Sequence, residues 1–216
     1  MALIRSVFQD ELDSVSQSLV DLCEKVSGTI QKATQSILTS DLKLAEEIIA
    51  SDIAIDDFQH DLDARIIDIV ARQQPVASDL RALATALRMS ADLERMGDMA
   101  HHVAKITRLR HPESAIPAEL HPIFDALGKA AEKIAKKTAV VIASRDTNMA
   151  LEIERDDDEI DDLHRQLISA LVAPNWKHGV ETAVDLTLLG RYYERYADHA
   201  VSVSRRVYFL VTGKFA

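Results

Sequence analysis

The sequence predicts an all-α protein, a tandem repeat of two antiparallel three-helix bundles. Three observations support this fold class. Glycine and proline number only six and five among 216 residues, and 47% of the residues are apolar, a composition typical of long helices with a buried face. The prolines lie where the apolar periodicity breaks. One charged motif also occurs twice, 100 positions apart.

The apolar periodicity and the prolines divide each half of the chain into three helices. The segment HPESAIPAELHP, residues 111–122, holds three of the five prolines and separates the halves. We therefore expect a first bundle over 1–110, a linker over 111–121 and a second bundle over 122–216. Helices of about 30 residues are roughly 45 Å long, and short connections make neighbouring helices antiparallel. The expected helices span 4–38, 41–73, 76–110, 122–144, 147–172 and 177–211.

Two pairs of helices indicate an internal duplication. Residues 92–100, DLERMGDMA, and residues 192–200, YYERYADHA, share the pattern Glu-Arg-x-x-Asp-x-Ala. The apolar positions between 45 and 66 recur 105 positions later, between 150 and 171. An aspartate interrupts both apolar series at the equivalent place, Asp52 in the first and Asp157 in the second.

Acidic residues four apart occur in equivalent positions of both halves. Such residues share one helix face, where like charges repel, and an aspartate on an apolar face is costly unless a cation or hydrogen bonds compensate its charge. If neighbouring helices bring these pairs together, four carboxylates converge in each half, and such oxygen ligands suit Mg²⁺, Mn²⁺ or iron. The pairs are Asp52 with Asp56, Glu94 with Asp98, Asp157 with Asp161, and Glu194 with Asp198. Salt bridges are the alternative to metal ions, with Arg81, Arg88, Arg191 or Arg195.

The histidines suggest a second alternative. Asp57-x-x-His60 and Asp161-x-x-His164 are similar to the half-sites of ferritin-like di-iron bundles. They are not repeat equivalents, however, because the 105-residue offset places Arg165 opposite His60. We expect ordinary surface or helix-end positions for the other candidates, His101, His102, His178 and His199.

Composition and motifs exclude several classes of function. The formal charge of −10 argues against a nucleic-acid partner, which needs clustered Lys and Arg. No glycine-rich phosphate loop, catalytic triad order or cysteine nucleophile motif occurs, so we expect no enzyme. The N-terminal residues MALIRSVFQDELD lack the apolar core of a signal peptide, and no segment is apolar enough to cross a membrane. The single cysteine, Cys23, suits a reducing compartment, so we expect the protein in the cytoplasm.

These motifs together resemble the PhoU family, the accessory proteins of bacterial phosphate-specific transport. The resemblance covers nearly the whole chain, and its most specific part runs from Arg191 to Gly213. The chain departs from the family at His102 and Ser202, where the family often has Asn four residues after the motif aspartate. The other matching segments are Phe8–Leu12, Asp52-x-x-Ile55-Asp56, Pro75–Arg81 and Asp92–Asp98.

The resemblance implies a regulator that catalyses no reaction. PhoU-like proteins repress the phosphate-starvation response by connecting the ATPase of the phosphate ABC transporter, at the cytoplasmic membrane, to a sensor histidine kinase. Their repeated Glu/Asp-x-x-x-Asp motifs bind metal clusters, which leaves iron, manganese, magnesium or zinc as candidates here. We also expect a homodimer, and the alternative function is a ferritin-like carboxylate-bridged metalloenzyme. The implied metal ligands are Asp52, Asp56, Glu94, Asp98, Asp157, Asp161, Glu194 and Asp198.

Overall fold

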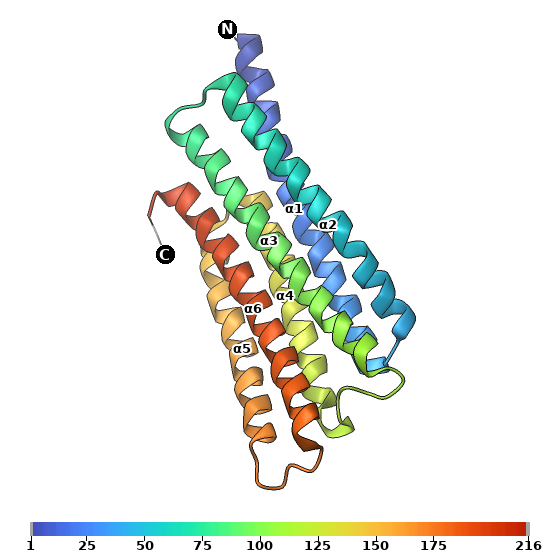
Figure 1. Cartoon of the computed structure of the whole chain (residues 1–216). Helices are drawn as coiled ribbons and strands as arrows, with labels where there is room; N and C mark the ends of the chain where they lie inside the picture. The colour runs from blue at the N-terminus through green and yellow to red at the C-terminus, as the bar shows by residue number, and fades with distance from the viewer. Residues whose placement is uncertain (1, 215–216) are drawn as a thin grey trace.

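The chain folds into six long helices and one short 3-10 helix, and no strand occurs in residues 2–214 (Figure 1). The computed structural model describes the backbone of these residues and the side chains of residues 7–214. Position 1 and positions 215–216, at the ends of the predicted bundles, lie outside the described residues. The helices are α1 (Ala2–Thr39), α2 (Leu42–Gln73), α3 (Ala77–Arg110), η1 (Ala118–Leu120), α4 (His121–Ser144), α5 (Thr147–Leu171) and α6 (Gly179–Thr212).

These helices confirm the predicted fold class, and every end in the described residues lies within two positions of the expected one. The start of α6 differs because residues 173–179 form a turn. The backbone N–H of Trp176 donates to the carbonyl of Ala173, and the Trp176 indole donates to the carbonyl of Gly179 at 2.8 Å. Gly179 has a φ of +82°, which favours glycine, so the helix begins only at this residue.

The duplication extends to the starts of the second helices. The Asp41 carboxylate caps α2 by accepting from the N–H of Leu44 at 3.0 Å. At the equivalent position, Asp146 caps α5 and accepts from Asn148 at 2.8 Å and Met149 at 3.1 Å. Such caps satisfy N–H groups that the first turn of a helix leaves without partners. The same residue type therefore begins α2 and α5 for the same physical reason.

Each half forms a three-helix bundle, and the two bundles lie side by side (Figure 1). All three helix pairs within each half are in contact. The first bundle meets the second through α1 and α3, which pack against α4 and α6, while α2 and α5 lie on the outer sides (Figure 1). Buried apolar residues of both halves form one continuous core. Whether 1–110 and 122–216 are separate domains joined by a linker over 111–121 stays a prediction.

The two bundles approach each other closely where α1 crosses α4. A Cβ atom on Gly128 would lie 2.3 Å from Cγ2 of Thr34, so any other residue at this position would displace the Thr34 side chain. The Thr34 hydroxyl in turn lies 2.8 Å from the hydroxyl of Tyr193, a fully buried residue of α6. A polar contact between α1 and α6 is thus buried beside this crossing.

None of the described helices is both long and apolar enough to span a lipid bilayer.

Candidate metal centres

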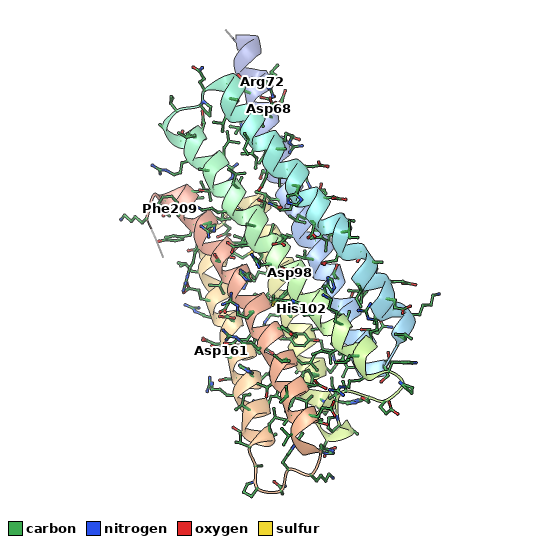
Figure 2. All side chains as sticks on the ribbon, viewed as in Figure 1. Asp68, Arg72, Asp98, His102, Asp161 and Phe209 are labelled. Atoms are coloured by element: carbon green, nitrogen blue, oxygen red, sulfur yellow. The ribbon has the colours of Figure 1, made fainter. Side chains whose placement is uncertain are left out.

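Side chains of α2 and α3 form a first cluster, which consists of Asp52, Asp56, Glu94, Asp98 and His101. The helical spacing of four residues places each acidic pair on one face of its helix, and α2 packs against α3. Nδ1 of His101 contacts the Asp52 carboxylate across this interface. Figure 2 shows Asp98 and His102 on α3, about one turn apart.

The carboxylates of the first cluster repel one another. Burial raises the pKa of Asp56, and the negative charges of Asp52 and Asp98 raise it further. Burial also raises the pKa of Glu94, with a further increase from Asp98 that Arg95 partly offsets. Asp56 and Glu94 therefore bind a proton more readily than an isolated carboxyl group does. This is expected where several carboxylates lie close together without enough positive charge to balance them.

The second cluster has the same composition in the other bundle. It consists of Asp157, Asp161 and His164 on α5 with Glu194 and Asp198 on α6. Nδ1 of His164 lies 3.4 Å from a Glu194 oxygen. Figure 2 shows Asp161 on α5, at the outer side of the second bundle. The eight carboxylates singled out in the sequence thus form two groups of four.

Burial and neighbouring charges also raise the pKa values of the second cluster. Burial is the main cause that raises the pKa of Asp157 to about 6, and the charges of Asp161, Asp198 and Glu194 add to it. The pKa of Asp161 is also raised, mainly by burial and then by Glu194 and Asp198. A cation between these side chains would reverse both effects, since it would stabilise the ionised carboxylates.

Three buried polar atoms of the two clusters lack a hydrogen-bond partner among the described side chains, Nε2 of His101, Oδ1 of Asp157 and Oε2 of Glu194. Such atoms are costly unless a ligand or ion satisfies them. The donor sets, oxygen with one imidazole nitrogen in each cluster, suit a hard cation. In the side-chain positions of residues 7–214, no three His, Cys, Asp or Glu groups are already arranged to hold one ion. Coordination would therefore require the carboxylates to turn toward one another.

Salt bridges compensate only part of this charge. Arg191 contacts Glu194, although not in hydrogen-bonding geometry, and Arg195 lies 3.8 Å from Asp198. Arg95 lies 3.8 Å from Asp98 and 3.7 Å from Glu94. Each of these pairs joins two residues of the same helix, α3 or α6. The aspartates of both clusters on α2 and α5 have no ion pair with Lys or Arg in the side chains that the structure describes.

The structure corrects the expectation for two histidines, because His101 and His199 are not ordinary surface residues. Their side chains are only 14% and 15% exposed, and His199 Nδ1 lies 3.1 Å from Asp92. The His101 position had a signal in the sequence, since it follows Asp98 by three residues on the same helix face.

Of the other histidines, His102 stacks on Tyr192 with ring centroids 5.1 Å apart, and His178 lies 2.6 Å from Glu119. The proposed ferritin-like half-sites differ from each other. His164 belongs to the second cluster, whereas Asp57 and His60 are exposed.

Comparison with known proteins identifies the family of this repeated helical chain. The family model of the PhoU domain matches residues 19–107 and 124–207. The chain belongs to the PhoU family. It is 42% identical to "Phosphate-specific transport system accessory protein PhoU homolog 2" of Mycobacterium tuberculosis, over 98% of this chain and 100% of that protein. A Rhizobium meliloti homolog of the same accessory protein is 29% identical over 98% of this chain and 90% of its own.

Two crystal structures share the fold of this PhoU-family chain. The phosphate transport system regulatory protein PhoU from Streptococcus pneumoniae has a TM-score of 0.87 at 26% identity, covering 97% of this chain and 99% of its own. PhoU from Pseudomonas aeruginosa has a TM-score of 0.85 at 25% identity, covering 96% and 100%. The PhoU matches thus cover both bundles, including the helices that carry the two clusters.

Proposed function

We propose that this chain is an accessory regulator of phosphate-specific transport and represses the phosphate-starvation response. In this role it couples the ATPase of the phosphate ABC transporter to a sensor histidine kinase at the cytoplasmic face of the membrane. The observation that carries the proposal is the similarity to accessory proteins of phosphate-specific transport along 98% of the chain. The similarity extends over both bundles and is not confined to one of them.

The two clusters are, in this proposal, metal sites that support binding rather than catalysis. Iron, manganese, magnesium or zinc would be held by the four carboxylates of each cluster, with His101 or His164 beside them. The ion would supply positive charge that ends the repulsion between the carboxylates. Through these contacts α2 would be fixed against α3, and α5 against α6, which would give the partners two defined surfaces.

The ferritin-like alternative has less support. A di-iron centre of that type lies in the core of one four-helix bundle and receives ligands from all four helices. Here the acidic residues form two separate clusters, each between two helices of a three-helix bundle. We therefore propose a non-enzymatic protein. From the family resemblance we further propose that it works in the cytoplasm as a homodimer.

Deletion of the gene tests the regulatory role. A reporter of phosphate-starvation genes should be switched on in phosphate-rich medium, and the wild-type gene should restore repression. Expression that stays repressed after deletion, in a strain without a second copy of the family, would contradict the proposal. A metalloenzyme predicts no such change in the reporter.

The role of the clusters needs a variant that keeps the fold. Asp52→Asn with Asp157→Asn removes one central carboxylate from each cluster. If the clusters support signalling, this variant should accumulate normally but fail to restore repression. The control Asp61→Asn removes an exposed charge from α2 outside the clusters and should restore it. Full repression by the cluster variant would show that the carboxylates are dispensable for signalling.

A further inference from the structure

A cleft between α3 and α6 gathers positive charge on a chain whose formal charge is −10. Its volume is about 410 Å³, within the usual range of small-molecule pockets, about 300–1,000 Å³. Figure 2 places Phe209, which also lines the cleft, near the C-terminal end of α6. Four arginines and two hydroxyl side chains line it, namely Arg81, Thr85 and Arg88 of α3 and Ser202, Arg205 and Arg206 of α6.

Only two of the four arginines have a carboxylate partner. Arg205 donates to Glu154 at 2.6 Å, and Arg206 donates to Asp92 at 2.9 Å. Arg81 and Arg88 are exposed and form no ion pair within residues 7–214. The Arg81 guanidinium lies 5.4 Å from the ring centre of Phe209, which orients it without neutralising it. Two positive charges of the cleft are thus available to an anion.

Thr85 adds a hydroxyl group between these two arginines. The residue is only 7% exposed and lines the cleft, yet its hydroxyl forms no hydrogen bond within the described side chains. Other buried threonines of this chain, such as Thr34 and Thr138, donate to a carbonyl one turn earlier. The Thr85 oxygen is not among the fully buried polar atoms that lack a partner, so it is open to the cleft and available to a ligand there.

The opposite end of the α3–α6 interface shows how the duplicated structure neutralises an arginine. There Arg110 donates to Asp185 and to Glu181, both at 2.5 Å. Under the 100-residue offset, Arg81 replaces Glu181 and Thr85 replaces Asp185. Where α6 carries two acidic residues, α3 carries a cation and a hydroxyl, so the cleft lacks the carboxylates that neutralise Arg110 at the other end.

From these contacts we infer that the cleft binds a phosphate-bearing anion with at least two negative charges. Guanidinium groups match phosphate oxygens in geometry, and hydroxyls complete such sites. Arg81 and Arg88 are two helical turns apart, roughly 10 Å along the axis, a spacing that suits an elongated anion such as a diphosphate better than a single phosphate. Asp198 of the second cluster also lines the cleft and lies 3.8 Å from Arg195. The inference is independent of the regulatory role, because binding requires neither transporter nor kinase.

Calorimetric titration of the full chain with pyrophosphate in EDTA tests the inference. We expect one saturable site per chain, with inorganic phosphate binding more weakly. Arg81→Gln with Arg88→Gln should weaken pyrophosphate binding about tenfold or more, since each charge-assisted bond is lost. Thr85→Val should weaken it roughly threefold, and Thr85→Ser should keep it near the wild-type value. Unaltered helical circular dichroism of each variant verifies the fold.

The matched control removes two exposed arginines outside the cleft, Arg108→Gln with Arg155→Gln, and should leave the affinity within about twofold. Equal weakening by both double variants would mean a diffuse charge effect and would overturn the inference, as would absence of saturable binding. Vesicles of phosphatidylcholine with and without phosphatidic acid distinguish the source of the phosphate. Binding to the acidic vesicles that depends on Arg81, without binding of pyrophosphate, would overturn a site for a free anion.

Discussion

Replacing Asp157 by Asn tests whether the second cluster is destabilised by its own charge when no cation is bound. In the folded chain the pKa of Asp157 is raised from 3.8 to about 6, first by burial and then by Asp161 and Asp198. The folded state therefore binds this proton more tightly than the unfolded state, and stability falls as the pH rises between these two values. At about 1.36 kcal/mol per pH unit the interval corresponds to about 3 kcal/mol, which solvent screening at this partly exposed position reduces to about 1–2 kcal/mol.

The assay is thermal unfolding in EDTA at several pH values. Because each kcal/mol corresponds to about 2–4 °C for a chain of this size, Asp157→Asn should raise Tm by about 2–8 °C near neutral pH. The gain should shrink between about pH 6 and pH 4, where wild-type Asp157 becomes protonated in the folded state. Asp61→Asn removes an exposed charge from α2 and should change Tm little at any pH.

Two results would refute this reasoning. A lower Tm for Asp157→Asn near neutral pH would mean that the ionised carboxylate has a favourable partner in the metal-free protein. A gain that does not depend on pH would mean that the substitution acts through packing and not through the proton.

Two further predictions concern the interface between the bundles. Gly128→Ala should lower the free energy of unfolding by about 1–2 kcal/mol in chemical denaturation, because the clash with Thr34 costs about 1–3 kcal/mol and helix propensity returns up to about 1 kcal/mol. The control Gly28→Ala, which meets no atom within 4 Å, should be neutral or stabilising, and an equal loss in both variants would exclude the clash as the cause. Burial alone would raise the pKa of Asp92, but hydrogen bonds from His199, Arg206 and Ser202 lower it, so Asp92→Asn should cost about 1–3 kcal/mol at neutral pH. This cost should diminish in unfolding titrations below the ordinary pKa of 3.8, and a cost that persists there would contradict the role of the charge.

The sequence was sufficient to predict the helices and their repetition. Apolar residues recur with the helical period, and a capping aspartate precedes α2 and α5 at equivalent positions, so local signals agree with the fold. The packing of α1 and α3 against α4 and α6 could not be predicted in this way. Periodicity shows which face of a helix is buried, but not which helix covers it; Thr34 and Tyr193, for example, are 159 positions apart.

In the candidate site, too, the sequence predicted contacts within one helix but not contacts between helices. The carboxylate pairs of both clusters could be identified because each pair lies on one helix, where spacing determines proximity. His101 and His199 were missed because their partners, Asp52 and Asp92, lie on other helices. The Arg81 and Arg88 charges of the cleft were considered only as partners for the cluster carboxylates, since the sequence does not show that both face α6. Metal binding itself stays a prediction.

The central claim, that the carboxylate clusters are cation sites, is tested most directly by comparing Tm in EDTA with Tm in Mn²⁺. At a free ion concentration of about 100 times the dissociation constant the folded state gains about 2.7 kcal/mol, which predicts a rise of about 5–10 °C. Asp52→Ala with Asp56→Ala should abolish the part of this rise that the first cluster contributes and leave the metal-free protein as stable as before or slightly more stable. Coinciding melts in EDTA and in Mn²⁺, Mg²⁺ or Fe²⁺, together with a metal-free double variant that is less stable, would contradict the claim and show that contacts of the metal-free protein, such as that of Asp52 with His101, stabilise these aspartates.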